Sequence, residues 1–151
     1  MKVNINNLTF GAFNETGFRS LFKKVITGEN IENDPGITIT FVGLTRIRKL
    51  NCQYRKKDNP TDVLSFGEPD ISWPINNKSS IGELIICPRV VEKNAKRYGV
   101  TRDEELKRVV IHGALHLLGY DHKKCINDSQ EEIYIRQEKY LKSASRLRLI
   151  K

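Results

Sequence analysis

The sequence TRDEELKRVVIHGALHLLGYDH, residues 101–122, is the stretch on which the fold and the function most depend. Thr101 and Glu104 have the spacing of a capping box, in which each side chain bonds a backbone N–H of the first helical turn. Gly119 suits the turn after a helix because glycine adopts positive φ without steric cost. The pattern predicts a helix over about residues 102–118. Its second half is apolar nearly all round, which predicts that the helix is buried.

All three histidines of the chain lie in this stretch, at His112, His116 and His122. On a helix His112 and His116 project from one face, one turn apart, and a reversal at Gly119 brings His122 back toward them. Three imidazole ligands leave one position of a zinc ion open to water, as in catalytic zinc sites. A lone histidine here is also compatible with a hydrogen-bonded core residue. The complete pattern H-x-x-x-H-x-x-G-x-x-H predicts a metal site.

The neighbours of these histidines limit the chemistry of the predicted site. Metzincin proteases share the ligand spacing but carry a glutamate directly after the first histidine, as the general base for the zinc-bound water. Here that position is Gly113, so peptide hydrolysis by that route is disfavoured. Cys125 is an alternative fourth ligand that would make the zinc structural. Asp121 is either an acceptor for the other ring N–H of a ligand histidine or a turn residue.

The composition is that of a soluble globular protein with a basic excess. A length of 151 residues suits a single domain, residues 1–151. The formal net charge of +8 favours polyanionic partners such as nucleic acid, although solubility alone explains it equally well. We find no secretory signal and no apolar run long enough to span a bilayer. Three cysteines without a pairing pattern favour a reducing compartment, so we expect a cytoplasmic protein.

Hydrophobic periodicity and turn residues predict the other elements and the fold class. The resulting order βαβαββααα predicts an α+β fold: a single domain with a small mixed β-sheet, packed by helices around the buried central helix that carries the zinc motif. Residues 67–79 are expected to form a long exposed loop. The predicted strands are 2–8, 37–42, 63–66 and 81–87, and the further predicted helices are 16–27, 45–54 (capped by Thr45), 88–98 and one beginning near Ser129.

Two segments concentrate positive charge. Residues 46–57, RIRKLNCQYRKK, surround Tyr54 with cations. A groove for nucleic acid typically combines such charges with a stacking aromatic ring. A solvated helix face has the same composition, and the charge run alone favours that interpretation. A second stripe of cations at residues 89–97 has the same two interpretations and is expected to be ordinary surface.

Three motifs together resemble one protein family. HGALHLLGYDH (112–122), Leu50-Asn51 with Tyr54-Arg55 (50–55), and PTDVLSF (60–66) are similar in order and spacing to motifs of the YbeY family, bacterial zinc-dependent endoribonucleases of ribosomal RNA maturation. The resemblance extends from about residue 37 to about residue 141. It departs at Glu83, where aspartate is common, and at Ile133, where methionine is frequent.

The resemblance implies a site and an activity. It implies one zinc ion per chain held by His112, His116 and His122, with Arg55 and His116 as catalytic residues. It further implies cleavage of single-stranded RNA in small-subunit ribosomal RNA processing and ribosome quality control, with RNA and components of the small subunit as partners. A zinc peptidase-like hydrolase and a non-catalytic ribosome- or RNA-binding module with a structural zinc are the alternatives.

Overall fold

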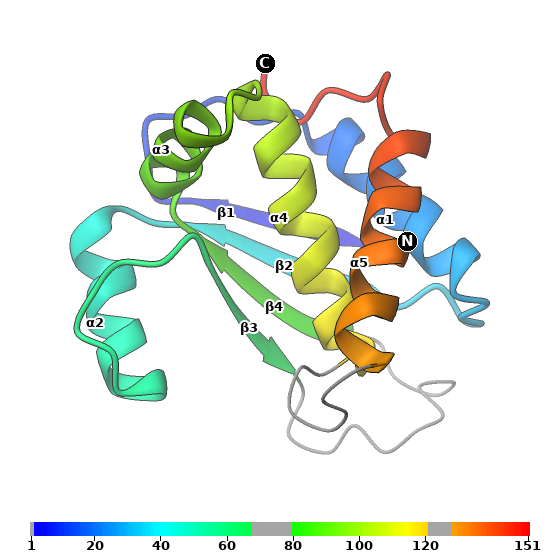
Figure 1. Ribbon diagram of the computed structural model, residues 1–151, viewed down its shortest axis with the longest axis horizontal. Helices are drawn as coiled ribbons and strands as arrows, with labels where there is room; N and C mark the ends of the chain where they lie inside the picture. The colour runs from blue at the N-terminus through cyan, green and yellow to red at the C-terminus, as the bar shows by residue number, and fades with distance from the viewer. Residues whose placement is uncertain (1, 68–79, 121–127) are drawn as a thin grey trace.

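The computed structural model describes residues 2–67, 80–120 and 128–151, without the side chains of 128–131. The described elements follow the predicted order (Figure 1), and the α+β fold with a mixed sheet is confirmed. Apart from Gly67, the expected loop at 67–79 lies outside the described residues. The elements are β1 (Val3–Asn7), α1 (Glu15–Gly28), β2 (Gly36–Phe41), α2 (Leu44–Arg55), β3 (Val63–Gly67), β4 (Ser80–Ile86), α3 (Pro88–Tyr98), α4 (Arg102–Leu117) and α5 (Asp128–Ser143).

The sheet has the strand order β1-β2-β4-β3. β1, β2 and β4 are parallel, and β3 runs antiparallel to β4 at the edge. Gly82 in β4 has a φ of +134°, and a Cβ there would collide with the carbonyl oxygen of Phe66 on β3. Only glycine therefore fits this close approach of the two strands.

Helices cover both faces of the sheet. α4 lies across one face with α5 beside it, and α2 lies on the side of the edge strand β3 (Figure 1). Because side chains alternate along a strand, Leu84 and Ile86 join the large core with α1, α4 and α5, whereas Ile85 joins a smaller core with Ile47 of α2 and Leu64 of β3. Within the described residues, no helix is long and apolar enough to cross a membrane.

The two predicted side-chain caps that can be compared, at α4 and α2, behave differently. At α4 the capping box forms as predicted: Thr101 Oγ1 accepts from the Glu104 amide at 3.1 Å, and Glu104 Oε2 accepts from the Thr101 amide at 3.2 Å. At α2 the predicted cap is wrong, because Gly43, and not Thr45, is the N-cap residue. Gly43 lies two residues after the end of β2 and has an extended backbone, so α2 begins at Leu44, two residues before the first helical position that a Thr45 cap predicts. The start predicted for α5, near Ser129, cannot be compared in the same way, because the side chains of residues 128–131 are not described.

Buried charges of α4 fasten the segment that follows α5. The Lys107 Nζ donates to the carbonyl oxygens of Leu147 (3.1 Å) and Ala144 (3.4 Å), and lies 3.3 Å from the Asp103 carboxylate. Asp103 Oδ1 in turn accepts from the amides of Leu149 (2.8 Å) and Ile150 (3.0 Å). Since a buried charge is costly unless it is paired and hydrogen-bonded, α4 and residues 144–150 stabilise one another.

Candidate active site

His112 and His116 lie one turn apart on α4 and face the same point. Their Nε2 atoms are 2.9 Å apart, and their ring planes meet at 78°. With Zn–N distances of about 2.0–2.1 Å, two ligand nitrogens of a tetrahedral zinc site are separated by about 3.3 Å. The donor type and the converging rings therefore fit a shared metal ion, with a small outward movement of the two nitrogens.

Gln137 of α5 orients the first histidine. Its side-chain oxygen lies 2.7 Å from His112 Nδ1, and Gln137 is 4% exposed. With Gln137 Oε1 as the acceptor, the proton of a neutral His112 is on Nδ1, and the Nε2 lone pair on the His116 side is the one that can bind a metal. The sequence analysis missed this residue. The available signal was an amide four residues after the buried Ile133, on the core-facing side of an amphipathic helix.

The third predicted ligand, His122, lies outside the described residues, as do Asp121 and Cys125. Within the part of the chain that the structure describes, no group of three or more His, Cys, Asp or Glu side chains is placed to hold a metal ion. The predicted ligand set therefore remains a prediction. The approach to His122 is described as far as Tyr120, after Gly119 has turned the chain with a φ of +105°.

A carboxylate at the C-cap of α1 holds Tyr120, the last described residue of that approach. Glu29 accepts hydrogen bonds from the hydroxyls of Tyr120 (2.7 Å) and Tyr140 (2.6 Å), and from the Arg136 guanidinium (3.1 Å). We call these four residues the Glu29 cluster. Burial, together with the neighbouring Glu29 carboxylate, raises the pKa of both Tyr120 and Tyr140 above the ordinary tyrosine value. The cluster joins α1, α5 and the residue that leads toward His122.

A cavity of about 1360 Å³ opens beside the two histidines. It extends from α4 to the edge strand β3 and the last turn of α2, where Arg55 lines it. Buried Asn51 holds this end of α2 to the chain entering β3, because its amide nitrogen donates to the Asn59 carbonyl at 2.8 Å. The fold thus brings Arg55, His112 and His116 to one cavity, although α2 and α4 are far apart in sequence.

A charged pair that the sequence analysis did not single out lines the same cavity. Arg108 of α4 lies 3.1 Å from Glu105 and 3.8 Å from Glu138 of α5. Burial of Glu105 raises the pKa of its carboxyl group, and the neighbouring Arg108 opposes that change. The only feature of the local sequence that could have predicted this position is the spacing of Glu105, Arg108 and His112, which places them on one face of a helix.

Gly113 faces the sheet. A Cβ at this position would lie 2.8 Å from the Leu84 Cδ2 and 3.3 Å from the Ser65 Oγ, and Leu84 is fully buried. The glycine that the sequence analysis noted as a missing base therefore has a packing role, because it lets α4 approach β3 and β4 closely. A glutamate side chain at this position would collide with buried Leu84 of β4.

Known proteins are similar to this chain in sequence and fold. The family described as Endoribonuclease YbeY matches residues 4–145. A curated relative from Thermotoga maritima with that name is 39% identical over 108 residues, which are 72% of this chain and 67% of the relative. One from Staphylococcus carnosus is 41% identical over 115 residues, covering 73% and 72% of the two chains.

A solved structure agrees with these matches. A solution structure of a Thermotoga maritima protein superposes with a TM-score of 0.64 at 32% identity, and covers 94% of this chain and 88% of that chain. The family match spans all nine named elements from β1 to the end of α5 except the first residue of β1. On the histidine motif, the shared cavity and these matches, the chain belongs to the YbeY family.

Proposed function

We propose that this protein is a zinc-dependent endoribonuclease that cleaves single-stranded regions of ribosomal RNA during maturation of the small ribosomal subunit. The observation that carries the proposal is the converging His112–His116 pair, which opens on a cavity shared with Arg55. Membership of a family whose curated relatives are named endoribonucleases supports the same activity. The net charge of +8 suits a polyanionic substrate.

The metal would be held by His112, His116 and His122. A zinc ion bound there supplies a Lewis acid and lowers the pKa of its bound water toward neutrality. Gln137 keeps His112 in the tautomer that presents Nε2. The Glu29 cluster holds Tyr120, two residues before the proposed third ligand in sequence.

Arg55 would bind the phosphate next to the bond that is cleaved. A guanidinium group offers a planar fork of donors that matches two phosphate oxygens and stabilises the charge that develops on them. Arg55 is exposed at the end of α2 and lines the cavity, so it can reach a strand lying there. Since Gly113 supplies no base, a water molecule, a phosphate oxygen or the ribose 2′-hydroxyl would take part in the proton transfers.

The biological setting follows from the same proposal. Small-subunit ribosomal RNA and components of that subunit would be the partners, a role in ribosome quality control would follow from the same cleavage, and the protein would act in the cytoplasm. A zinc peptidase is the weaker alternative because the residue after His112 packs against Leu84 and not into the cavity.

The test is cleavage of a single-stranded RNA by the purified protein, with zinc content measured on every sample. We expect His116→Ala and a chelator-treated sample to lose both zinc and cleavage. Arg55→Ala should keep zinc and lose cleavage by about 100-fold or more, the usual cost of removing a donor to a developing negative charge. Arg48→Ala is the matched control, since Arg48 also belongs to α2 but pairs with Asp58 at 2.9 Å.

Two outcomes would contradict the proposal. Identical residual cleavage in all samples would mean a contaminating nuclease and would favour a non-catalytic RNA- or ribosome-binding module. Cleavage of peptides with RNA left intact would favour the peptidase.

A further inference from the structure

Three exposed tyrosines surround the cavity beside the histidines. Tyr54 of α2, Tyr98 of α3 and Tyr134 of α5 all line it. They are 59%, 57% and 52% exposed. Single exposed aromatic residues are common on protein surfaces and need no explanation. Three of them from three separate helices at one cavity form a concentrated aromatic surface next to the proposed site of chemistry.

Ring contacts support two of these tyrosines without covering them. Tyr54 packs edge-to-face on Phe66 of β3, with ring centroids 5.0 Å apart and an angle of 71° between the planes. Tyr134 lies 6.2 Å from the His112 ring at a tilt of 33°. Contacts of this kind hold a ring in place while much of its surface remains available to a ligand.

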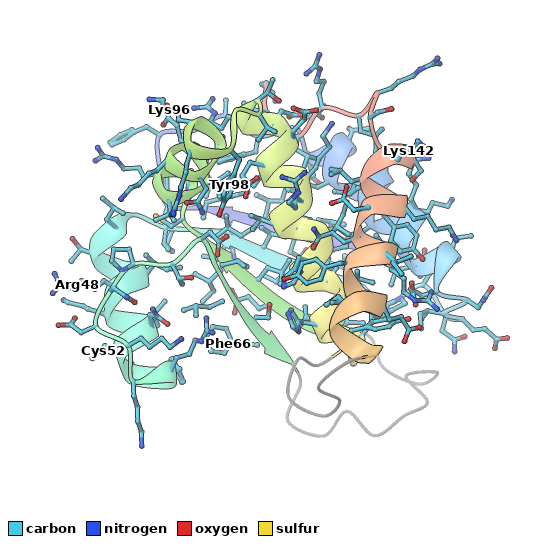
Figure 2. The ribbon with its side chains drawn as sticks, in the orientation of Figure 1. Arg48, Cys52, Phe66, Lys96, Tyr98 and Lys142 are labelled. Atoms are coloured by element: carbon cyan, nitrogen blue, oxygen red, sulfur yellow. The ribbon has the colours of Figure 1, made fainter. Side chains whose placement is uncertain are left out.

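Exposed cations adjoin Tyr54 and Tyr98 in sequence. Tyr54 is followed directly by Arg55, Lys56 and Lys57, and Tyr98 is preceded directly by Lys96 and Arg97; all five cations are exposed. Lys96 and Tyr98 extend from α3, while Phe66 lies near α2 (Figure 2).

The lining of the cavity closer to α4 has a different character. It carries the carboxylates Asp62, Glu105 and Glu138 beside Arg108. Exposed positive charge is therefore concentrated next to Tyr54 and Tyr98, although Lys96 also lies 3.8 Å from the Glu92 carboxylate.

This pairing of charge and aromatic surface fits one class of ligand. An unpaired nucleotide offers a flat base and a phosphate, and proteins that bind single strands place aromatic rings under the bases and cations along the backbone. A double helix keeps its bases stacked and hidden from such rings. A peptide of ordinary composition has no repeating negative charge to match the cations.

We infer that Tyr54 and Tyr98 are base-stacking residues, which bind unpaired bases of an RNA strand on the two sides of the nucleotide that reaches the histidines. The inference rests on the proposed function, which it deepens by naming the groups that select a single strand. The cations beside each ring bind the adjacent phosphates. Tyr134, next to His112, contacts the nucleotide between them.

The experiment measures binding of a fluorescent single-stranded oligonucleotide with 2′-O-methyl riboses to the full-length chain. We expect Tyr54→Ala and Tyr98→Ala each to raise Kd by about 5- to 150-fold, the range found when a base-stacking ring is removed. Tyr98→Phe keeps the ring and should stay within about twofold of wild type. Phe10→Ala is the matched control, because Phe10 is fully exposed and does not line the cavity.

A second experiment tests which base each tyrosine contacts. In oligonucleotides with abasic positions, the wild type should lose affinity by a factor similar to that of the alanine variants. For Tyr98→Ala, removing the base that Tyr98 contacts should cause no further loss of affinity. An RNA duplex of the same length should compete weakly. Thermal unfolding of each variant shows whether it is folded.

The result that would overturn the inference is a Kd within twofold of wild type for both Tyr54→Ala and Tyr98→Ala. The inference would also be overturned if abasic positions reduced the affinity of wild type and of the alanine variants by the same factor. Cleavage of unmodified RNA by the wild type is measured in parallel. Tyrosine-dependent binding without cleavage would remove the proposed function and keep this inference, whereas cleavage with no effect of the tyrosines would do the reverse.

Discussion

The five tyrosines of the chain divide between two environments. Tyr120 and Tyr140 belong to the Glu29 cluster, where each hydroxyl donates to the same carboxylate. Tyr54, Tyr98 and Tyr134 line the cavity and are more than half exposed. The hydroxyl is the anchored part of the first pair, whereas the ring face is the accessible part of the other three.

This difference separates stability from binding. Removing a hydroxyl in the Glu29 cluster leaves part of a buried carboxylate unsatisfied, which costs free energy of folding. Removing a hydroxyl at the cavity leaves the ring and its stacking surface intact. The same tyrosine-to-phenylalanine substitution therefore reports on two different roles, and the predictions below use it in that way.

The largest effect is expected from removing the carboxylate itself. Glu29→Ala leaves two tyrosine hydroxyls and Arg136 without their shared acceptor and should lower the free energy of unfolding by about 3 kcal/mol. Glu15→Ala is the control, because Glu15 forms an exposed i,i+4 pair with Arg19 that contributes less than about 0.5 kcal/mol. Chemical denaturation measures both. Equal losses in the two variants would contradict the role of the cluster.

Single hydroxyl deletions should have intermediate effects. Tyr120→Phe and Tyr140→Phe each remove one hydrogen bond to a charged acceptor, and each should cost about 1–2 kcal/mol of unfolding free energy. Tyr98→Phe at the cavity should change it by less than about 0.5 kcal/mol. Denaturation midpoints at neutral pH provide the comparison, and a loss in Tyr98→Phe as large as in Tyr140→Phe would erase the distinction between the two environments.

The smallest effect is a dependence on alkaline pH. The folded pKa of Tyr120 and Tyr140 is raised, so their contribution is complete below the unfolded pKa of about 10 and is lost as the pH rises toward the folded pKa. At pH 10 the two tyrosines together should lower the free energy of unfolding by about 0.8 kcal/mol. The measurement is unfolding free energy at pH 8 and pH 10. Wild type should lose more than the Tyr120→Phe, Tyr140→Phe double variant, and identical losses would refute the assignment.

The sequence predicted local features well because their causes are local. The capping box and Gly119 predicted the limits of α4 to within one residue, and hydrophobic periodicity predicted the order of strands and helices. The cap of α2 was wrong because a backbone-only start at Gly43 leaves no side-chain signature. The expectation that Arg55 acts with the histidines came from the family resemblance, since no local pattern connects α2 with α4.

The contacts that shape the site were beyond such patterns. Glu29 meets Tyr120 and Tyr140 across 91 and 111 residues of sequence, and Gln137 meets His112 across 25. Each of these side chains is an ordinary polar residue on its own helix, and its role depends on which helices the sheet brings together. The sequence showed that Gly113 cannot act as a base. Its packing role against Leu84 became apparent only from the way α4 lies on β4.

The fastening of α4 by residues 144–150 has a consequence for biosynthesis. Asp103 and Lys107 are translated roughly 40 residues before the backbone groups that satisfy them, with separations of 46 and 47 residues for Asp103 and 37 to 40 for Lys107. On a nascent chain both charges remain hydrated until residues 144–150 have left the ribosomal tunnel, so the helix that carries His112 and His116 cannot settle into its core position before then. A metal ion bound by His112 and His116 would therefore find its site in place only after residues 144–150 have emerged.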